Sequence, residues 1–217
     1  MKKIAVILSG CGVFDGAEVN EVILSLLAIE QQGATWQAFA PDKPQFHVIE
    51  HHSGNEQQEQ RNVLREAGRI VRGDILPLSQ LLADDYDALL VPGGFGVAKN
   101  LSDFAFKGSA CELDPDFKKA AKDFATNEKP AGYLCIAPAL TPLIYGPGVK
   151  ATLGRNDDDA VTAFSALGGE HVACPVDDYV LDQNRRLLTT PAYMLAESIS
   201  EAQRGIQRLV GKLIELA

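Results

Sequence analysis

The sequence has no apolar run that approaches the ~18 residues of a membrane-spanning helix. Its N-terminal apolar segment, Ile4 to Leu8, is also too short for the hydrophobic region of a signal peptide. Low-complexity segments, internal repeats and shifts in composition are absent, and the most polar run covers only residues 53–61. We therefore expect a single domain over residues 1–217, located in the cytoplasm and without contact to a membrane.

Basic residues are scarce, because 20 Lys and Arg stand against 29 Asp and Glu and give a net charge of −9. They are scattered along the chain, whereas binding to a phosphate backbone requires them to be clustered. This argues against nucleic acid and anionic membrane surfaces as partners. The acidic excess is sufficiently explained by the solubility that it confers.

Cysteine and histidine are rare, with four residues of each. The cysteines form no CxxC pair, and His51-His52 has no cysteine or carboxylate at a spacing typical of a metal site. No metal site is therefore expected, and the cysteines should be free thiols in a reducing compartment. The cysteines are Cys11, Cys111, Cys135 and Cys174, and the histidines are His47, His51, His52 and His171.

Short apolar runs alternate with amphipathic segments along the chain. The run from Ile4 to Leu8 is continuous, which is typical of a strand buried on both faces of a parallel sheet. The segment 18–32 repeats its apolar residues at helical spacing and ends at Gly33, a natural helix C-cap. This alternation predicts an α/β fold with a doubly wound, mostly parallel sheet. Strands are expected at 4–8, 35–40, 48–51, 88–91, 131–134, 171–173, 179–182 and 187–190, and helices at 18–32, 62–71, 114–126, 159–167 and 194–216.

Sites in doubly wound sheets lie at the carboxyl ends of the strands, near the point where the strand order reverses. Three segments that follow expected strands compete for this place. They are Ser9–Gly16, Pro92–Gly96 and Leu134–Pro138.

Cys135 carries the strongest local signal, because it directly follows an expected strand and enters the small-residue run from Ile136 to Ala139. A nucleophile at a sharp strand-to-helix turn has a strained backbone and projects above the sheet. The amides at the start of the following helix are expected to lower the pKa of the thiol, and the Ile136 amide can donate to an oxyanion. The alternative, an inert cysteine packed in the core, stays open.

Gly93 and Gly94 follow another expected buried strand. With no side chain in the way, their amides can form the other half of an oxyanion hole. A plain tight turn explains the same pair, so the functional interpretation depends on Cys135 lying nearby.

Glu18 and Glu21 lie at the start of the first expected helix. Carboxylates at this end stabilise the helix dipole, which is sufficient to explain both. Either one can instead exchange a proton with a nearby thiol as a general acid or base. Glu21 is the more inward of the two, since Val22 and residues 24–26 follow it directly.

Cys11, Asn100 and His171 are further candidates. Cys11 follows the first strand and is either a small wall residue of the site or a resolving thiol for redox chemistry. Asn100 either contributes a polar group to a pocket or caps a turn. His171 is the one rival for a Cys–His pair, although its place at the start of an expected strand suggests the amino-terminal end of the sheet, opposite to Cys135. The remaining cysteines and histidines are expected at the periphery or on the surface.

These motifs, in this order, resemble the PfpI-like members of the class I glutamine amidotransferase-like superfamily. The shared elements are Glu21, Gly93-Gly94, Cys135-Ile136-Ala137 and the Thr190-Pro191-Ala192 that ends the expected hairpin. The resemblance is closer to the ElbB branch, the glyoxalase-like isoprenoid biosynthesis or enhancing lycopene biosynthesis proteins, and covers essentially the whole chain. The strings that carry it are Leu8–Val13, Phe39–Lys43, Arg61–Leu64, Pro92–Ser102, Cys135–Ala139 and His171–Leu195.

The resemblance implies a flavodoxin-like, three-layer α/β/α sandwich with Cys135 as the nucleophile. It implies Glu21 as the carboxylate near the thiol, with Glu18 as the fallback, and Gly94 and Ile136 as the oxyanion donors. The implied activity converts glyoxal or methylglyoxal to the hydroxy acid, without glutathione or any cofactor, through a hemithioacetal on Cys135. A small reactive aldehyde is thus the expected partner, together with a second copy of the chain in a homodimer.

One departure from the superfamily pattern is a missing histidine. Glutaminases of this superfamily pair their cysteine with a histidine and a glutamate near the C-terminal end, whereas residues 189–193 contain no histidine. Glutamine hydrolysis is therefore not expected. The same absence favours an alternative, a non-enzymatic stress or metabolic regulatory or binding protein with a vestigial site.

Overall fold

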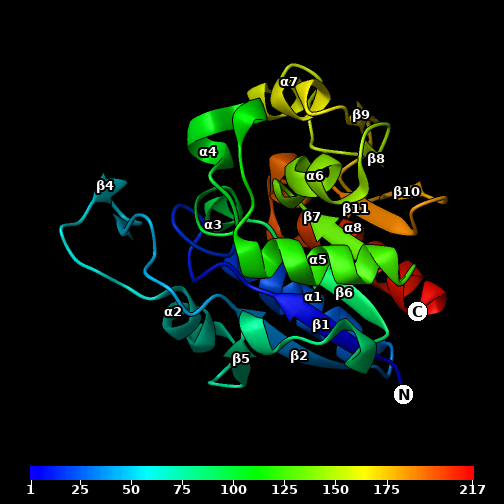
Figure 1. The fold of residues 1–217 in the computed structure, drawn as a ribbon, viewed down its shortest axis with the longest axis horizontal. Coiled ribbons are helices and arrows are strands. Elements are labelled where there is room, and N and C mark those ends of the chain that lie inside the picture. The colour runs from blue at the N-terminus through cyan, green and yellow to red at the C-terminus, as the bar shows by residue number, and fades with distance from the viewer.

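Seven strands form one sheet in the computed structural model, which describes all of residues 1–217 (Figure 1). Their bounds are β1 Lys3–Ile7, β2 Thr35–Ala40, β5 Ile75–Pro77, β6 Ala88–Val91, β7 Ala131–Leu134, β10 Val180–Asp182 and β11 Leu187–Thr190. The strands lie in the order β10-β11-β7-β6-β1-β2-β5, and every adjacent pair is parallel except β10 and β11. The expected α/β fold with a mostly parallel sheet is confirmed.

Both faces of the sheet are buried, which explains the continuous apolar runs of its central strands. Ile4 and Val6 of β1 pack in one hydrophobic cluster, whereas Ala5 and Ile7 pack in the other. Successive side chains of a strand point to opposite faces, so a strand covered on both sides must be apolar at every position.

Helices cover both sides and complete the expected three-layer sandwich. One hydrophobic cluster includes side chains of α1 (Val19–Gln31), α2 (Val63–Ile70) and α8 (Ile199–Leu216). The other includes those of α3 (Phe95–Lys99), α4 (Phe104–Lys107), α5 (Pro115–Thr126), α6 (Thr141–Tyr145) and α7 (Asp159–Ala166). Figure 1 shows α5 in front of the strands, with α8 behind them. None of the helices combines the length and the apolar character needed to cross a membrane.

The last helix begins later than its apolar pattern suggests. The expected helix starts at residue 194, whereas α8 starts at Ile199. Ser198 is the N-cap, and its hydroxyl accepts a hydrogen bond from the Glu201 amide at 3.3 Å. Residues Ala192–Met194 form a separate 3-10 turn after β11. The helical spacing of the apolar residues therefore extends upstream of the true start of α8.

Two expected strands lie outside the seven-stranded sheet, and one strand of that sheet was not predicted. Within 48–51, β3 (Ile49–Glu50) pairs with β4 (Asn55–Glu56) in a hairpin that projects away from the sheet (Figure 1). Near 171–173, β9 (Glu170–His171) pairs with β8 (Lys150–Ala151) in a small sheet of its own. The strand β5 was missed because it has only three residues, ends in proline and lies at the sheet edge.

The strand order reverses between β1 and β6, and the loops that follow these strands are joined there. The Phe95 amide donates to the Val13 carbonyl at 2.8 Å, and the Glu18 amide donates to the Gly93 carbonyl at 3.0 Å. This crevice is where a doubly wound sheet places its ligands.

Candidate active site

Cys135 occupies the turn directly after β7, and its backbone is in the left-handed region with a φ of +61°. Such a conformation is unfavourable for a residue with a side chain, and it persists here because the Cys135 amide donates to the Thr190 carbonyl at 3.0 Å. The side chain is 7% exposed and faces the crevice between the strand ends. The strained strand-to-turn geometry that the sequence suggests at this position is present.

Glu21 lies on the first turn of α1 and is fully buried. Its Oε2 accepts a hydrogen bond from the Gly93 amide at 2.8 Å, and its Oε1 accepts one from the Tyr193 amide at 3.3 Å. A Cβ atom on Gly93 would lie 2.8 Å from Glu21 Oε2 and 2.9 Å from Cys135 Sγ. The carboxylate and the thiol therefore meet at this glycine, which must lack a side chain for them to do so.

Burial raises the pKa of both acidic groups. Burial, and then the charge of Glu18, raises the pKa of the Glu21 carboxyl from 4.5 to about 7. Burial, and then the charge of Glu21, raises the pKa of the Cys135 thiol well above its ordinary value. At neutral pH the pair holds a neutral thiol beside a carboxyl group that titrates there.

The expectation of a thiol with a lowered pKa is therefore wrong. Cys135 is followed by a 3-10 turn, Ala137–Leu140, and by the five-residue α6, instead of one long helix. The amides of Gly94 and Ile136 do point at the sulfur and lower its pKa, but burial and the Glu21 charge outweigh them.

The same two amides are placed to bind an oxyanion formed at a carbon attached to Cys135 Sγ. Gly94 has a φ of +96°, and a Cβ there would overlap the backbone of Gly16 and Glu18. Gly93 is different, because its amide is already engaged by Glu21. Of the two glycines proposed as oxyanion donors, Gly94 alone has an amide directed at the sulfur.

Glu18 is the N-cap of α1, and its Oε2 accepts a hydrogen bond from the Glu21 amide at 2.6 Å. The helix-end interpretation therefore describes Glu18, whereas Glu21 is the carboxylate at the thiol. Glu18 still affects the chemistry, because its negative charge contributes to the raised pKa of Glu21.

A cavity of about 470 Å³ opens beside Cys135. Twelve of its sixteen lining residues are hydrophobic. The sequence-based candidates identified the cysteine end of this cavity and, through the segment Pro92–Gly96, the wall at Phe95, but they missed the other walls. Among the wall residues are Phe95, Phe104, Ala163, Tyr193 and Met194.

Comparison with known proteins identifies the family to which the chain belongs. The chain is 40% identical to the ES1 protein homolog, mitochondrial, of Rattus norvegicus over 223 aligned positions, which cover 99% of this chain and 84% of the rat protein. It is also 40% identical to the human glutamine amidotransferase-like class 1 domain-containing protein 3, mitochondrial, over 99% of this chain and 83% of that protein. The chain belongs to the ES1 family of class 1 glutamine amidotransferase-like proteins. No protein-family model matches the chain.

A solved structure agrees with this assignment to the ES1 family. It is an isoprenoid biosynthesis protein with an amidotransferase-like domain from Ehrlichia chaffeensis. The two chains share 34% identity and superpose with a TM-score of 0.93, covering 100% of this chain and 99% of the other. The predicted resemblance to the class I glutamine amidotransferase-like superfamily is thereby confirmed.

The expected cytoplasmic location is contradicted by these ES1 relatives. Both the rat and the human protein are named as mitochondrial. The expectation rested on composition and on the lack of a recognisable targeting segment, and neither of these identifies the compartment of a globular domain.

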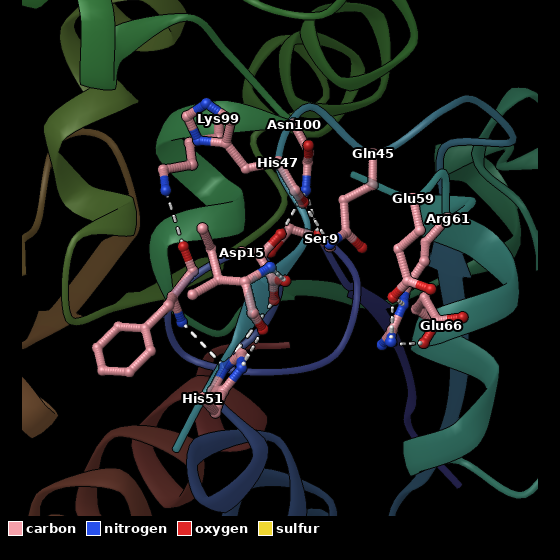
Figure 2. Close-up of polar contacts among 12 residues, drawn as sticks. Ser9, Asp15, Gln45, His47, His51, Glu59, Arg61, Glu66, Lys99 and Asn100 are labelled. Atoms are coloured by element: carbon pink, nitrogen blue, oxygen red, sulfur yellow. Dashed lines mark hydrogen bonds and ion pairs between the residues drawn. The ribbon is translucent and has the colours of Figure 1, made fainter. Parts of the chain in front are cut away.

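Asn100 lies outside the cavity and holds the loop after β1 in place. It ends α3, and its Nδ2 donates to the Ser9 and Asp15 carbonyls, each at 2.9 Å (Figure 2). Its Oδ1 accepts a hydrogen bond from the Phe46 amide at 3.0 Å. The side chain is 1% exposed and does not line the cavity, so it holds the loop after β1 in place rather than contacting a ligand.

Cys11 and His171 lie apart from the cavity lining. Cys11 is half-buried in the loop after β1, where burial, and then the charge of Glu66, raises the pKa of its thiol. His171 belongs to the β8–β9 pair, so its expected place at the amino end of the central sheet is wrong. Burial lowers the pKa of His171.

The remaining histidines and cysteines are also outside the cavity lining. Figure 2 shows His51, whose Nε2 accepts a hydrogen bond from the Phe14 amide at 3.2 Å and lies 3.9 Å from Asp15 Oδ1. No group of three or more His, Cys, Asp or Glu side chains is placed to hold a metal ion. The chemistry of the cavity therefore centres on Cys135 and Glu21.

Proposed function

We propose that this protein is a glyoxalase-like enzyme of the ElbB type, which converts glyoxal or methylglyoxal to the hydroxy acid without glutathione. The observation that carries the proposal is the buried pair of Cys135, which lines the cavity, and Glu21, which lies beside its thiol. A thiol can add to an aldehyde, and a carboxyl group that titrates near pH 7 can both accept and return a proton.

In the first step the Cys135 sulfur adds to one aldehyde carbon of glyoxal. The thiol proton passes to the Glu21 carboxylate, which then gives it to the former carbonyl oxygen to complete the hemithioacetal, so that Glu21 is a carboxylate again. The Gly94 and Ile136 amides stabilise the negative charge on that oxygen while the carbon–sulfur bond forms.

In the second step Glu21 moves a proton between the two substrate carbons. The carboxylate takes the proton from the carbon attached to sulfur, which leaves an enediolate, and returns it to the neighbouring carbon. The product is a thioester of glycolate on Cys135, formed without an external oxidant because one carbon is oxidised as the other is reduced. Water then cleaves the thioester and releases glycolate, a proton and the free thiol.

Turnover of glyoxal to glycolate in the absence of glutathione tests the proposal. We expect activity in the wild type, background rates in Cys135→Ser and Glu21→Gln, and nearly full activity in Cys11→Ser, which is the matched control. A Cys135→Ser variant as active as the wild type would contradict this mechanism.

A second candidate is a regulatory or binding protein with a vestigial site. It is favoured by the absence of histidine from the cavity lining and by the neutral state of the Cys135 thiol at neutral pH. Wild type and variants would then all give background rates with glyoxal and methylglyoxal.

The ES1 relatives' names support a mitochondrial setting for either function. The homodimer implied by the family resemblance stays a prediction, and sedimentation equilibrium of the purified chain tests it.

A further inference from the structure

The cavity beside Cys135 is much larger than glyoxal requires. A closed apolar cavity of ~150 Å³ already holds a benzene molecule, and this cavity measures about 470 Å³. Glyoxal has no carbon beyond its two linked aldehyde groups, so it would touch the cysteine end and leave the remaining walls in contact with water. Apolar walls that stay wet in the complex contribute nothing to binding.

Those walls belong to three helices of one face of the sheet. Phe95 comes from α3, Phe104 from α4 and Ala163 from α7, and all three line the cavity. Met194, from the turn after β11, lines it as well. Aromatic, methyl and thioether groups of this kind select an uncharged hydrocarbon group.

The charged residues of the cavity lining also favour an uncharged ligand. Its lining contains no Lys, Arg or His, whereas Asp158 and Asp159 are part of it. Asp158 is also the N-cap of α7, where its Oδ1 accepts a hydrogen bond from the Ala160 amide at 2.8 Å. A carboxylate or phosphate on the substrate would meet these acidic groups without a positive partner, which disfavours anionic substrates.

We propose that the preferred substrate is an α-oxoaldehyde that carries an uncharged apolar group of about the size of a phenyl ring. This inference rests on the proposed function and names its substrate class. The aldehyde carbon bonds to Cys135 Sγ, and the apolar group lies among Phe95, Phe104 and Ala163. The atom balance is unchanged, since the proton again moves from the sulfur-bearing carbon to the neighbouring carbon and water releases the hydroxy acid.

The test compares glyoxal, phenylglyoxal and 4-carboxyphenylglyoxal as substrates without glutathione, with product quantified by chromatography. We expect kcat/KM for phenylglyoxal to exceed those for both other compounds by about 10-fold or more. We expect Ala163→Phe, which fills the cavity, to lower kcat/KM for phenylglyoxal by a larger factor than for glyoxal, mainly through KM. The matched control is Thr162→Phe, because Thr162 is the exposed neighbour on the same helix and should leave the ratio unchanged.

The outcomes separate this inference from the proposed function. Turnover that depends on Cys135 but is fastest with glyoxal or with the carboxylated compound overturns the substrate class and leaves the glyoxalase intact. If no compound is turned over, the glyoxalase proposal fails. The preference of the cavity for an uncharged apolar group is then tested by binding of unreactive ketones. Ligand-observed NMR of Cys135→Ser should then detect acetophenone but not 4-acetylbenzoate, with the signal lost when Ala163→Phe is added. Equal binding of both ketones, or of neither, overturns the inference.

Discussion

The amide nitrogen of Gly93 lies 2.8 Å from Oε2 of Glu21, which joins the loop after β6 to the first turn of α1. The bond orients a fully buried carboxyl group toward Cys135 and partly offsets the rise in its pKa that burial causes. It also takes the Gly93 amide out of any oxyanion hole. One glycine thus positions the proton acceptor rather than the substrate.

Gly93→Ala should destabilise the fold and abolish turnover. The added Cβ would overlap Cys135 Cβ and crowd Glu21 Oε2, so the loop or the helix must shift, at a cost of about 1 to 3 kcal/mol. Urea denaturation and glyoxal turnover measure the two effects. Gly211→Ala in α8 is the control, because the site there is free of close contacts and alanine should stabilise the helix by roughly 0.5 to 1 kcal/mol. A Gly93→Ala variant as stable and as active as the wild type contradicts the close approach.

The rate should rise with pH through about 7, the raised pKa of Glu21, because its carboxylate form must accept the thiol proton. Glu18→Gln should move this rise to lower pH, since the charge of Glu18 is the second cause of the raised pKa. Glutamine keeps an oxygen that can accept from the Glu21 amide, so the helix cap is retained. The measurement is kcat/KM for glyoxal from pH 5 to 9 in both proteins. An identical pH profile in the two would show that Glu21 is not the titrating base.

Stability should fall as pH rises between 4.5 and about 7. Over this range the folded state keeps the Glu21 proton that the unfolded chain releases, so the contribution of this group is full below 4.5 and lost above about 7. The loss amounts to at most about 3 kcal/mol. Glu21→Gln removes it, and the difference in unfolding free energy between the two proteins at pH 5 and pH 8 isolates it. Parallel pH profiles for both proteins would contradict the raised pKa.

Asn100→Ala should destabilise the protein by about 2 kcal/mol or more, because it leaves the buried Ser9 and Asp15 carbonyls without their donor. The loop after β1 should loosen, with faster amide exchange around Val13. Asn127→Ala is the control, because its side chain bonds only to Asp84 on the surface and its loss should change stability by about 0.5 kcal/mol or less. Equal stability of the two variants would show that Asn100 does not hold the loop.

The nucleophile turn and the inward carboxylate were predictable because both depend on local pattern. Cys135 follows a short apolar run, and Glu21 begins the inward face of an amphipathic helix. His171 was misplaced because a strand pattern does not state which strand it pairs with. The start of α8 was misplaced because apolar spacing continued across the Ser198 cap.

Most residues of the cavity walls could not be predicted from local sequence pattern. The helices α3 and α4 have five and four residues, too few for a periodic pattern to appear. Tyr193 and Met194 follow β11, and the carboxyl-end rule would have found them had the pairing of β11 with β7 been known.

By itself the sequence determined the α/β class, the parallel strands and the position of Cys135 at a strand end. Burial on both faces requires a continuous apolar run, and a sharp turn requires small residues, so both are visible in consecutive residues. The tertiary structure alone decided that the Gly93 amide binds Glu21, that burial keeps the thiol protonated, and that an apolar cavity opens beside it. Each of these depends on groups far apart in the chain, whose distances and shared burial no local pattern records.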